Sequence, residues 1–171
     1  QGVSDQDVRI AGYARERGRA CIILLNKWDL VEKDATTAKQ HVNGVRERLK
    51  FLSFAPVWTI SALTGQRTLK IFDSVKTVYE QYTMRVSTGR LNRIFETIIG
   101  RHEPAMYRGR RIKFYYSTQT SVAPPTFVCF VNDPEGIHFS YERYMVNQLR
   151  EALGLDKTPL RLIFRKRDKK G

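Results

Sequence analysis

The sequence predicts an α/β domain over residues 1–86, followed by an α+β domain over residues 87–171. In the first part, short and uniformly apolar segments alternate with amphipathic segments, which is typical of parallel strands joined by crossover helices. In the second part, two strand-like segments follow one another without a helix between them. The chain has 171 residues, slightly more than one domain of about 150, so it can bury a core.

Helical spacing and capping residues define the elements expected in the first domain. Ser4 or Asp5 can cap a helix over 5–17 that Gly18 ends. The segment ACIILL at 20–25 has the pattern of a parallel strand covered on both faces. The remaining elements are a helix from Thr36 or Thr37 to Phe51, a strand at 57–60, a loop at 61–66 and a helix over 69–82.

The second domain follows a short joint of capping residues at 87–89. An apolar stripe at helical spacing predicts its first helix, and branched or aromatic residues predict its strands. The expected order is a helix that ends at Gly100, strands at 112–120 and 126–132, a turn at 133–136, a helix over 141–153 and a strand over 160–167.

Composition excludes several classes of protein. Apolar residues make up 42% of the chain and charged residues 27%, values that argue against a disordered or collagen-like chain. The longest apolar run, 20–25, is far shorter than the roughly 20 residues that span a bilayer, and no signal peptide opens the chain. We therefore expect a soluble cytoplasmic protein with no membrane partner. Cys21 and Cys129 lack metal-ligand spacing and are expected to be small buried hydrophobes in a reducing compartment.

The charge balance points to a polyanionic partner. The formal net charge is +13 and the isoelectric point is near 10. Residues 1–85 carry 14 basic and 9 acidic side chains, whereas residues 86–171 carry 16 and 8. We therefore expect the docking surface for nucleic acid or another polyanion in the second half, and charge alone does not distinguish the two kinds of partner.

The segment Asn26-Lys27-Trp28-Asp29 follows the first predicted strand, where ligands bind in α/β folds. The Asp29 carboxylate can accept two hydrogen bonds from the N1–H and 2-amino groups of guanine. Adenine has no donor at N1, so it would leave this carboxylate desolvated and unpaired. Asn26 can tie the loop together and reach acceptors of the base, and Lys27 can lay its apolar stem along the purine. The alternative is an ordinary polar turn capped by Asp.

A second motif, Ser61-Ala62-Leu63, follows the next predicted strand. Here the Ala62 N–H can donate to guanine O6, and Ser61 can buttress the first loop. Taken alone, these three residues are an ordinary helix-entry turn. Because each motif ends a strand and a helix connects the two strands, together they predict a guanine site.

These two motifs match the fourth and fifth guanine-nucleotide motifs of P-loop GTPases. The whole chain, including STGRLNRIFETII, GRRIKFYYSTQT, PPTFVCFVND and YERYMVNQLREALGL, resembles the carboxyl-terminal part of the Der (EngA) family. The resemblance implies the second half of a second GTPase domain followed by a KH-like domain. It also implies GTP or GDP as ligand, a role in maturing the large bacterial ribosomal subunit, and ribosomal RNA and upstream GTPase domains as partners.

The phosphate-binding half of a GTPase is missing from the sequence. It has no GxxxxGKS or GxxxxGKT loop, and we identify no DxxG switch motif. Mg²⁺ would therefore be held only by the missing half, and no catalytic residue is assigned. We expect this chain alone neither to hydrolyse GTP nor to bind it tightly. Without an upstream strand, the strand at 20–25 is expected to leave a bare edge, which a longer chain or a partner would cover.

The KH-like domain has no GxxG loop, so the backbone clamp of ordinary KH domains is not expected. Tyr115 and Tyr116 are expected on opposite sheet faces, so at most one of them could stack on a base, and core packing is the favoured role. Alternative functions are a nucleotide-independent RNA-binding module and a protein-interaction module. The candidate phosphate contacts form three groups: Arg108, Arg110, Arg111 and Lys113; Arg143, Asn147 and Arg150; and Arg165, Lys166, Arg167, Lys169 and Lys170.

Overall fold

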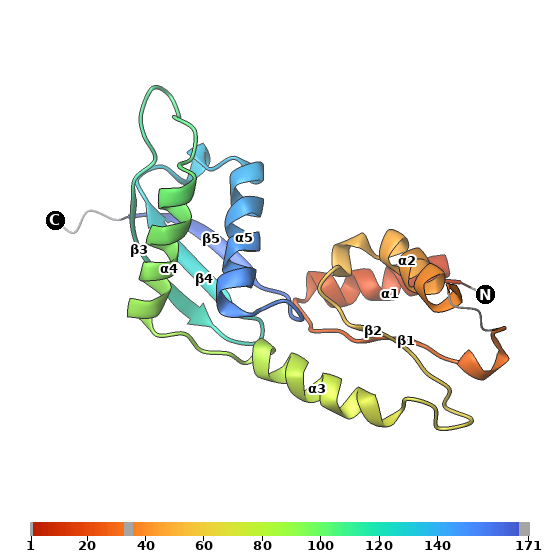
Figure 1. The fold of residues 1–171 in the computed structure, drawn as a ribbon. Helices are drawn as coiled ribbons and strands as arrows, with labels where there is room; N and C mark the ends of the chain where they lie inside the picture. The colour runs from red at the N-terminus through yellow and green to blue at the C-terminus, as the bar shows by residue number, and fades with distance from the viewer. Residues whose placement is uncertain (1, 33–35, 168–171) are drawn as a thin grey trace. The chain divides into compact units, whose positions relative to one another are not determined.

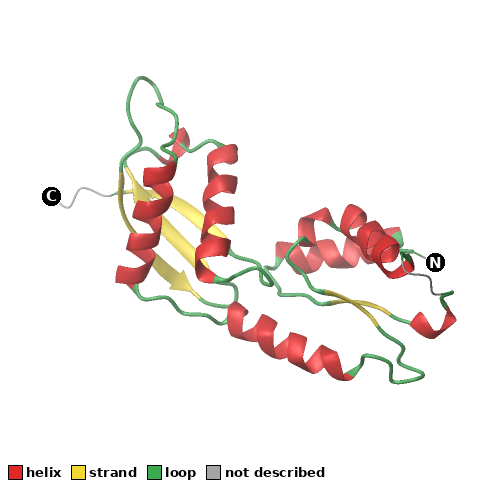
Figure 2. Ribbon diagram, in the orientation of Figure 1, coloured by secondary structure: helices red, strands yellow, loops and turns green. Residues whose placement is uncertain are grey.

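The structure is a computed structural model that describes residues 2–32 and 36–167. The chain forms two compact units, shown in Figures 1 and 2. The first comprises Gln1–Gln81 with Lys157–Pro159, and the second comprises Tyr82–Asp156 with Leu160–Gly171. Within the described ranges, no helix is both long enough and apolar enough to cross a membrane.

The first unit is an α/β layer built on a small parallel sheet. The strands β1 (Ile23–Leu25) and β2 (Val57–Thr59) pair in parallel, with Ile23 opposite Val57. This confirms the predicted crossover through a helix. The helices are α1 (Asp5–Glu16), α2 (Thr37–Arg48) and α3 (Leu69–Tyr82), and short 3-10 turns cover Trp28–Leu30 and Lys50–Leu52.

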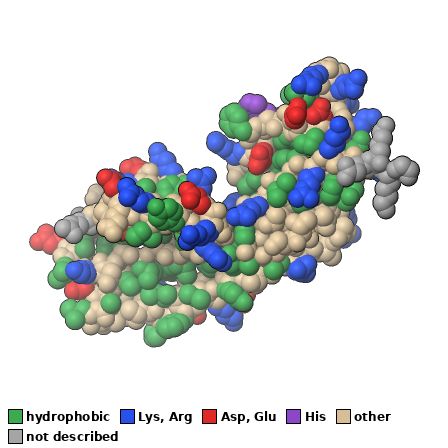
Figure 3. All heavy atoms as spheres, turned by 180° about the vertical axis from the view of Figure 1, so that it is seen from behind, with side chains coloured by type: hydrophobic (Ala, Val, Ile, Leu, Met, Phe, Trp, Pro, Cys, Tyr) green, Lys and Arg blue, Asp and Glu red, His purple; other side chains and the backbone are tan. Residues whose placement is uncertain are grey.

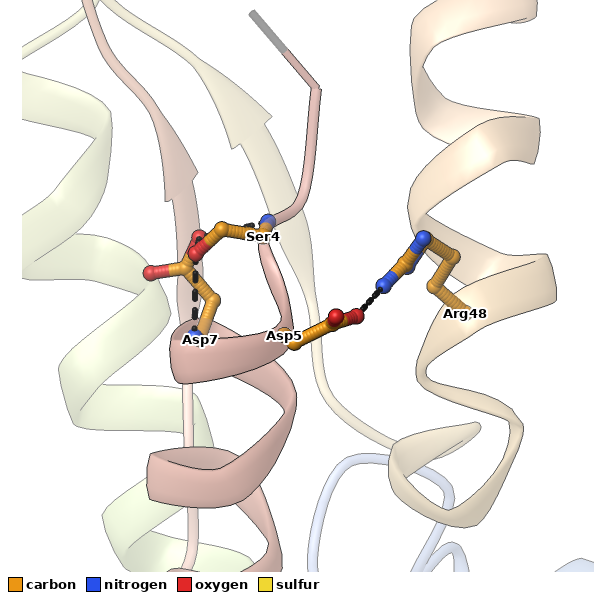
Figure 4. A network of polar contacts seen from close by, with 4 residues as sticks. All are labelled: Ser4, Asp5, Asp7 and Arg48. Atoms are coloured by element: carbon orange, nitrogen blue, oxygen red, sulfur yellow. Dashed lines mark hydrogen bonds and ion pairs between the residues drawn. The ribbon is translucent and has the colours of Figure 1, made fainter.

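Helix α1 begins where the sequence predicts, at a capping box (Figure 4). The Ser4 hydroxyl accepts the Asp7 N–H at 3.2 Å, and the Asp7 carboxylate accepts the Ser4 N–H at 2.9 Å. The Ser4 hydroxyl also donates to the Asp7 carboxylate at 2.7 Å, and this bond together with the one from the Ser4 N–H lowers the pKa of Asp7. Asp5 also pairs with Arg48 of α2, an exposed ion pair that contributes little to stability.

The apolar faces of the first unit are only partly covered, contrary to the prediction for residues 20–25. Strand β1 has three residues, pairs only with β2 among the described residues, and exposes 40% of Leu24. A groove of about 880 Å³ borders it. The buried cluster is small and consists of Val45, Leu49, Leu52 and Ala55. Helix α3 exposes four of its large apolar side chains, namely Leu69, Phe72, Val75 and Tyr79.

The second unit is an α+β layer in which two helices cover one face of a three-stranded sheet (Figures 1 and 2). The strand order is β3-β4-β5, with β3 antiparallel and β5 parallel to the central strand. The parallel pair follows from the crossover through α5. The elements are α4 (Thr88–Arg101), β3 (Phe114–Ser121), β4 (Thr126–Val131), α5 (Phe139–Leu153) and β5 (Arg161–Lys166).

A continuous apolar core joins the helices of the second unit to its sheet. It contains Leu91, Phe95 and Ile98 of α4, Met145, Leu149 and Leu153 of α5, and Phe127, Cys129 and Leu162 of the sheet. Cys129 is fully buried, which confirms it as a buried hydrophobe, and this burial raises the pKa of its thiol to about 12. Cys21 is only half-buried, and burial also raises its pKa.

Helix α5 starts two residues before the predicted Tyr141. The His138 ring accepts a hydrogen bond from the Ser140 N–H at 3.3 Å, so it caps the helix at an earlier position than the apolar periodicity indicates. The predicted end is correct, because Gly154 takes a left-handed conformation with φ of 67°.

The Asn92 side chain on α4 supplies hydrogen bonds to the edge strand β3. Its amide oxygen accepts the Ser117 N–H at 2.7 Å, and its amide nitrogen donates to the Ser117 carbonyl at 2.9 Å. Ser117 is buried, so these backbone groups have little access to water. Asn92 therefore takes the place of a neighbouring strand at this residue.

We expect Asn92→Ala to lower the free energy of unfolding of the second unit by roughly 1–3 kcal/mol, because it leaves buried backbone groups of Ser117 unpaired. Denaturant titration measures the change. Asn147→Ala on the exposed face of α5 is the control and should change stability by less than about 0.5 kcal/mol. Equal effects of the two substitutions would contradict the assigned role of Asn92.

Candidate functional site

The loops that follow β1 and β2 are joined by the side chain of Asn26. Its amide oxygen accepts the Lys27 N–H at 2.8 Å and the Ala62 N–H at 3.0 Å. Both loops lie at the carboxyl ends of parallel strands, so the strand pairing brings them side by side. Asn26 therefore ties the two motifs together.

Ser61 connects the second loop to the carboxylate of Asp29. Ser61 is fully buried, its hydroxyl donates to Asp29 Oδ1, and the same hydroxyl accepts the Thr64 N–H at 3.2 Å. The Trp28 N–H donates to the Ile60 carbonyl at 3.0 Å, and the buried Trp28 ring meets His41 edge-on. The carboxylate is thereby held from one side, and each of its oxygens can accept more than one hydrogen bond.

The Ala62 N–H has a partner within the protein. The sequence prediction directs it at guanine O6, and in the structure it donates to Asn26 Oδ1. The nearby side-chain acceptor satisfies a backbone donor that the turn would otherwise leave open. Lys27 has a left-handed backbone with φ of 61°, and Leu63 is 87% exposed, so both side chains border the loops on the outside.

The first basic group of the second unit lies on a hairpin between α4 and β3. Tyr107 and Arg110 exchange two backbone hydrogen bonds of 2.9 Å, and Arg108 and Gly109 between them both have positive φ. Gly136 supports the hairpin closely, since a Cβ there would lie 2.4 Å from Ile112 Cδ1. The hairpin thus presents a fixed set of exposed cations: Arg108, Arg110, Arg111 and, at its end, Lys113.

Asp133 to Gly136 have the letters DxxG, but they do not form a switch loop. Pro134–Gly136 is a 3-10 turn within the second unit, and Gly136 packs against Tyr107 and Ile112. This agrees with the turn predicted there.

The second basic group does not form one exposed surface. Arg143 is exposed beside the Phe139 ring, and Asn147 is exposed on the same helix. Arg150 is instead half-buried and donates to the Leu155 carbonyl at 2.7 Å, and burial lowers its pKa. The structure therefore gives Arg150 a role in holding the turn after α5.

The third basic group continues the sheet. Arg165 and Lys166 belong to β5, and the Arg167 N–H still pairs with the Val131 carbonyl at 3.0 Å. The Lys113 N–H donates to the Asn132 side chain at 2.8 Å, at the same end of β4. Lys113 of the first group and Arg167 of the third group therefore both lie beside this end of the strand. Lys169 and Lys170 lie outside the described residues.

The expectation for Tyr115 and Tyr116 is wrong. A register shift pairs Phe114 with Val131 but Tyr116 with Phe130, so Tyr115 is an extra residue in the strand. Both tyrosines are exposed, at 42% and 47%, and neither belongs to the core.

Comparison with known proteins matches both units. A family profile described as the KH-domain-like, C-terminal domain of EngA bacterial GTPase enzymes covers residues 85–165. Proteins named GTPase Der from Syntrophobacter fumaroxidans and Desulforapulum autotrophicum are both 54% identical, over 100% and 96% of this chain. GTPase Der from Citrifermentans bemidjiense is 53% identical over 99% of it.

The chain belongs to the Der (EngA) family and corresponds to the carboxyl-terminal part of its members. It spans 39% of the length of the Syntrophobacter and Citrifermentans relatives and 34% of the Desulforapulum one. The fold is accordingly a partial GTPase domain of α/β type followed by a KH-like α+β domain, as the sequence predicted.

Three arginines of this Der-family chain were not singled out by the sequence analysis. Arg90, Arg93 and Arg101 line a groove of about 390 Å³ between α4 and α5. Arg101 also donates to the Gln148 side chain at 3.2 Å. Their spacing along α4 puts them on one side of the helix, and a helical projection of charges would have revealed them.

Metal ligands are absent from the portion of this Der-family chain that the structure describes: no cluster there of three or more His, Cys, Asp or Glu residues could hold an ion. Each histidine has aromatic or capping contacts instead. His41 meets Trp28, His102 lies beside Tyr141 and Tyr144, and His138 caps α5.

We expect Ser61→Ala in the complete protein to speed hydrogen exchange at the Thr64 amide and to cost roughly 1–3 kcal/mol of stability. The substitution removes the acceptor of that amide and the donor to Asp29. Amide exchange by mass spectrometry measures the effect, with exposed Ser53→Ala as control. Unchanged protection at Thr64 would show that Ser61 does not brace the loop.

Proposed function

We propose that this chain supplies the guanine-reading half and the RNA-binding KH-like module of a GTP-binding factor that assembles the large ribosomal subunit. The observation that carries the first part is the bracing of Asp29 by the buried hydroxyl of Ser61, in a loop that Asn26 joins to its neighbour. A carboxylate that is fixed in this way is prepared for a ligand with paired donors.

Guanine is the base that fits these loops. Its N1–H and 2-amino group donate to the Asp29 carboxylate, and the charged acceptor makes both hydrogen bonds strong. Within the described residues the amide nitrogen of Asn26 donates no hydrogen bond, so it is available to an acceptor of the purine. The Lys27 stem covers a face of the base. The Ala62 N–H reaches guanine O6 only by sharing its bond to Asn26.

The phosphates of GTP or GDP, and Mg²⁺ with them, belong to the half of the GTPase domain that precedes this segment in a longer chain. The open edge of β1 and its groove of about 880 Å³ offer a place for a further parallel strand. The exposed apolar residues of α3 offer that half a second surface. Hydrolysis, in this proposal, is a property of the complete cytoplasmic protein.

The KH-like module is proposed to contact ribosomal RNA through its basic hairpin and through β5. The hairpin carries Arg108, Arg110 and Arg111 in a fixed turn, and β5 carries Arg165, Lys166 and Arg167. Such cations release counterions from phosphates when they bind. The nucleotide state of the GTPase domains would then change the affinity for RNA by altering how the upstream domains dock.

We expect Asp29→Asn in the complete protein to weaken GTP binding by roughly 30- to 1,000-fold and to improve binding of xanthosine triphosphate. The amide loses one acceptor toward guanine but gains an N–H donor toward the 2-carbonyl of xanthine. Competition binding with the two nucleotides measures the change. The control is Asp73→Asn on the exposed side of α3, which should leave both affinities unchanged. Retained preference for GTP in the Asp29 variant would refute guanine reading by this residue.

We also expect the 171-residue chain by itself to show no GTP turnover and only weak GTP binding, above millimolar dissociation constants, because the contacts to phosphate are missing. Isothermal titration and a phosphate-release assay test this. Micromolar affinity or turnover by the purified chain would refute the assignment of phosphate binding to the upstream half.

A further inference from the structure

We propose that the face of the three-stranded sheet turned away from α4 and α5 is a stacking platform for unpaired bases of single-stranded RNA. The inference rests on the proposed RNA partner and specifies where and how it is bound. The platform consists of Tyr115, Tyr116, Phe130, Arg165 and Arg167.

Strand alternation identifies the residues on this face. Phe127 and Cys129 of β4 lie in the core with the helices, so Phe130 points to the other face. Leu162 and Phe164 of β5 likewise pack with the core, so Arg165 and Arg167 point away from it. None of the three strands contains an acidic residue. The face is therefore cationic.

The bulge in β3 brings both tyrosines to this face. Tyr116 lies opposite Phe130, with ring centroids 4.4 Å apart and planes at 18°. The Arg167 guanidinium lies 4.8 Å from the centroid of the Tyr115 ring, which places Tyr115 on the same side. Adjacent residues of a regular strand would point to opposite faces, so the extra residue at Tyr115 is what unites them.

The aromatic rings are available to a ligand. Tyr115 and Tyr116 are 42% and 47% exposed, although each already stacks on one neighbour. Figure 3, seen from the side opposite to Figure 1, shows Lys and Arg side chains interspersed with hydrophobic ones over this unit, together with some Asp and Glu side chains. A patch of exposed aromatic rings on a protein surface indicates an interaction site.

Single-stranded RNA is chemically complementary to the tyrosines and arginines of this face. Its bases have two apolar ring faces that stack on tyrosine, and its phosphates pair with guanidinium groups. A duplex hides its base faces and would contact the arginines alone. An acidic protein partner would form ion pairs with the arginines, but its binding would not depend on stacking against the aromatic rings. The paired rings therefore favour unpaired bases.

The test measures binding of this chain to a fluorescein-labelled oligouridine decamer by fluorescence anisotropy at several salt concentrations. We expect Tyr115→Ala and Tyr116→Ala each to weaken binding roughly 5- to 100-fold. Tyr116→Phe keeps the ring and should bind like the wild type. Arg165→Ala should reduce the slope of log affinity against log salt by about 0.7, the value for one phosphate of a single strand. The matched control is Tyr13→Ala on α1, where the tyrosine is 53% exposed.

Crosslinking of a 5-bromouridine decamer to the unmodified chain provides a second readout that does not depend on the folding of any variant. Crosslinks at Tyr115 or Tyr116 support the platform. Crosslinks confined to the hairpin at 106–111, or equal affinity for a duplex of the same length, would overturn it while leaving RNA binding by the module intact. If no RNA binds under any condition, both this inference and the proposed RNA partner fail.

If the tyrosine variants bind RNA normally but weaken association with a purified protein, the face is a protein-docking surface and the platform is likewise overturned. Circular dichroism of each variant shows whether the fold is retained. Because both tyrosines are exposed and lie outside the core, we expect unchanged spectra.

Discussion

The parallel pairing of β1 with β2 is the constraint on which the candidate guanine site depends. It puts the ends of two strands, 34 residues apart in register, at one edge of the sheet, where Asn26 and Ser61 each bond across from one loop to the other. Neither loop has regular structure of its own beyond a short 3-10 turn. Their geometry is therefore set by these cross-loop bonds and by the strands beneath them.

The two units differ in how completely they bury their apolar surface. The KH-like unit has a continuous core from α4, α5 and the sheet, and Asn92 satisfies the backbone of its edge strand. The partial GTPase unit has a four-residue buried cluster and leaves β1 and α3 largely open. Burial per residue is what makes a small unit independently stable. The second unit thus buries its own apolar core, whereas the first leaves apolar surfaces exposed on β1 and α3.

Local patterns sufficed to predict most of the elements. Capping residues located α1, Gly154 ended α5, and uniformly apolar runs identified parallel strands. The sequence also predicted that the two candidate guanine motifs follow neighbouring strands, and the structure has both loops at the ends of β1 and β2. It could not show that the Ala62 N–H turns to Asn26, that Arg150 is used within the fold, or that Tyr115 is a bulge residue. Each of these depends on a partner that is distant along the chain or on the pairing register, which local periodicity does not encode.

The same limit applies to burial. The pattern at 20–25 was that of a strand with two covered faces, but the pattern records only the apolar character of the residues and not what lies against them. Among the described residues the sheet of the first unit has two strands, so the apolar side chains of β1 have few neighbours. The exposed stripe of α3 has the same explanation.

We propose that Asp29 reads guanine. The most direct measurement is a crystal structure of the complete protein with GDP bound, from which the distances between the Asp29 carboxylate oxygens and guanine N1 and N2 are read. We expect both nitrogens to lie within about 3.2 Å of the carboxylate, with Ser61 still bonded to it. A base bound elsewhere, or a carboxylate turned away from the purine, would contradict the account.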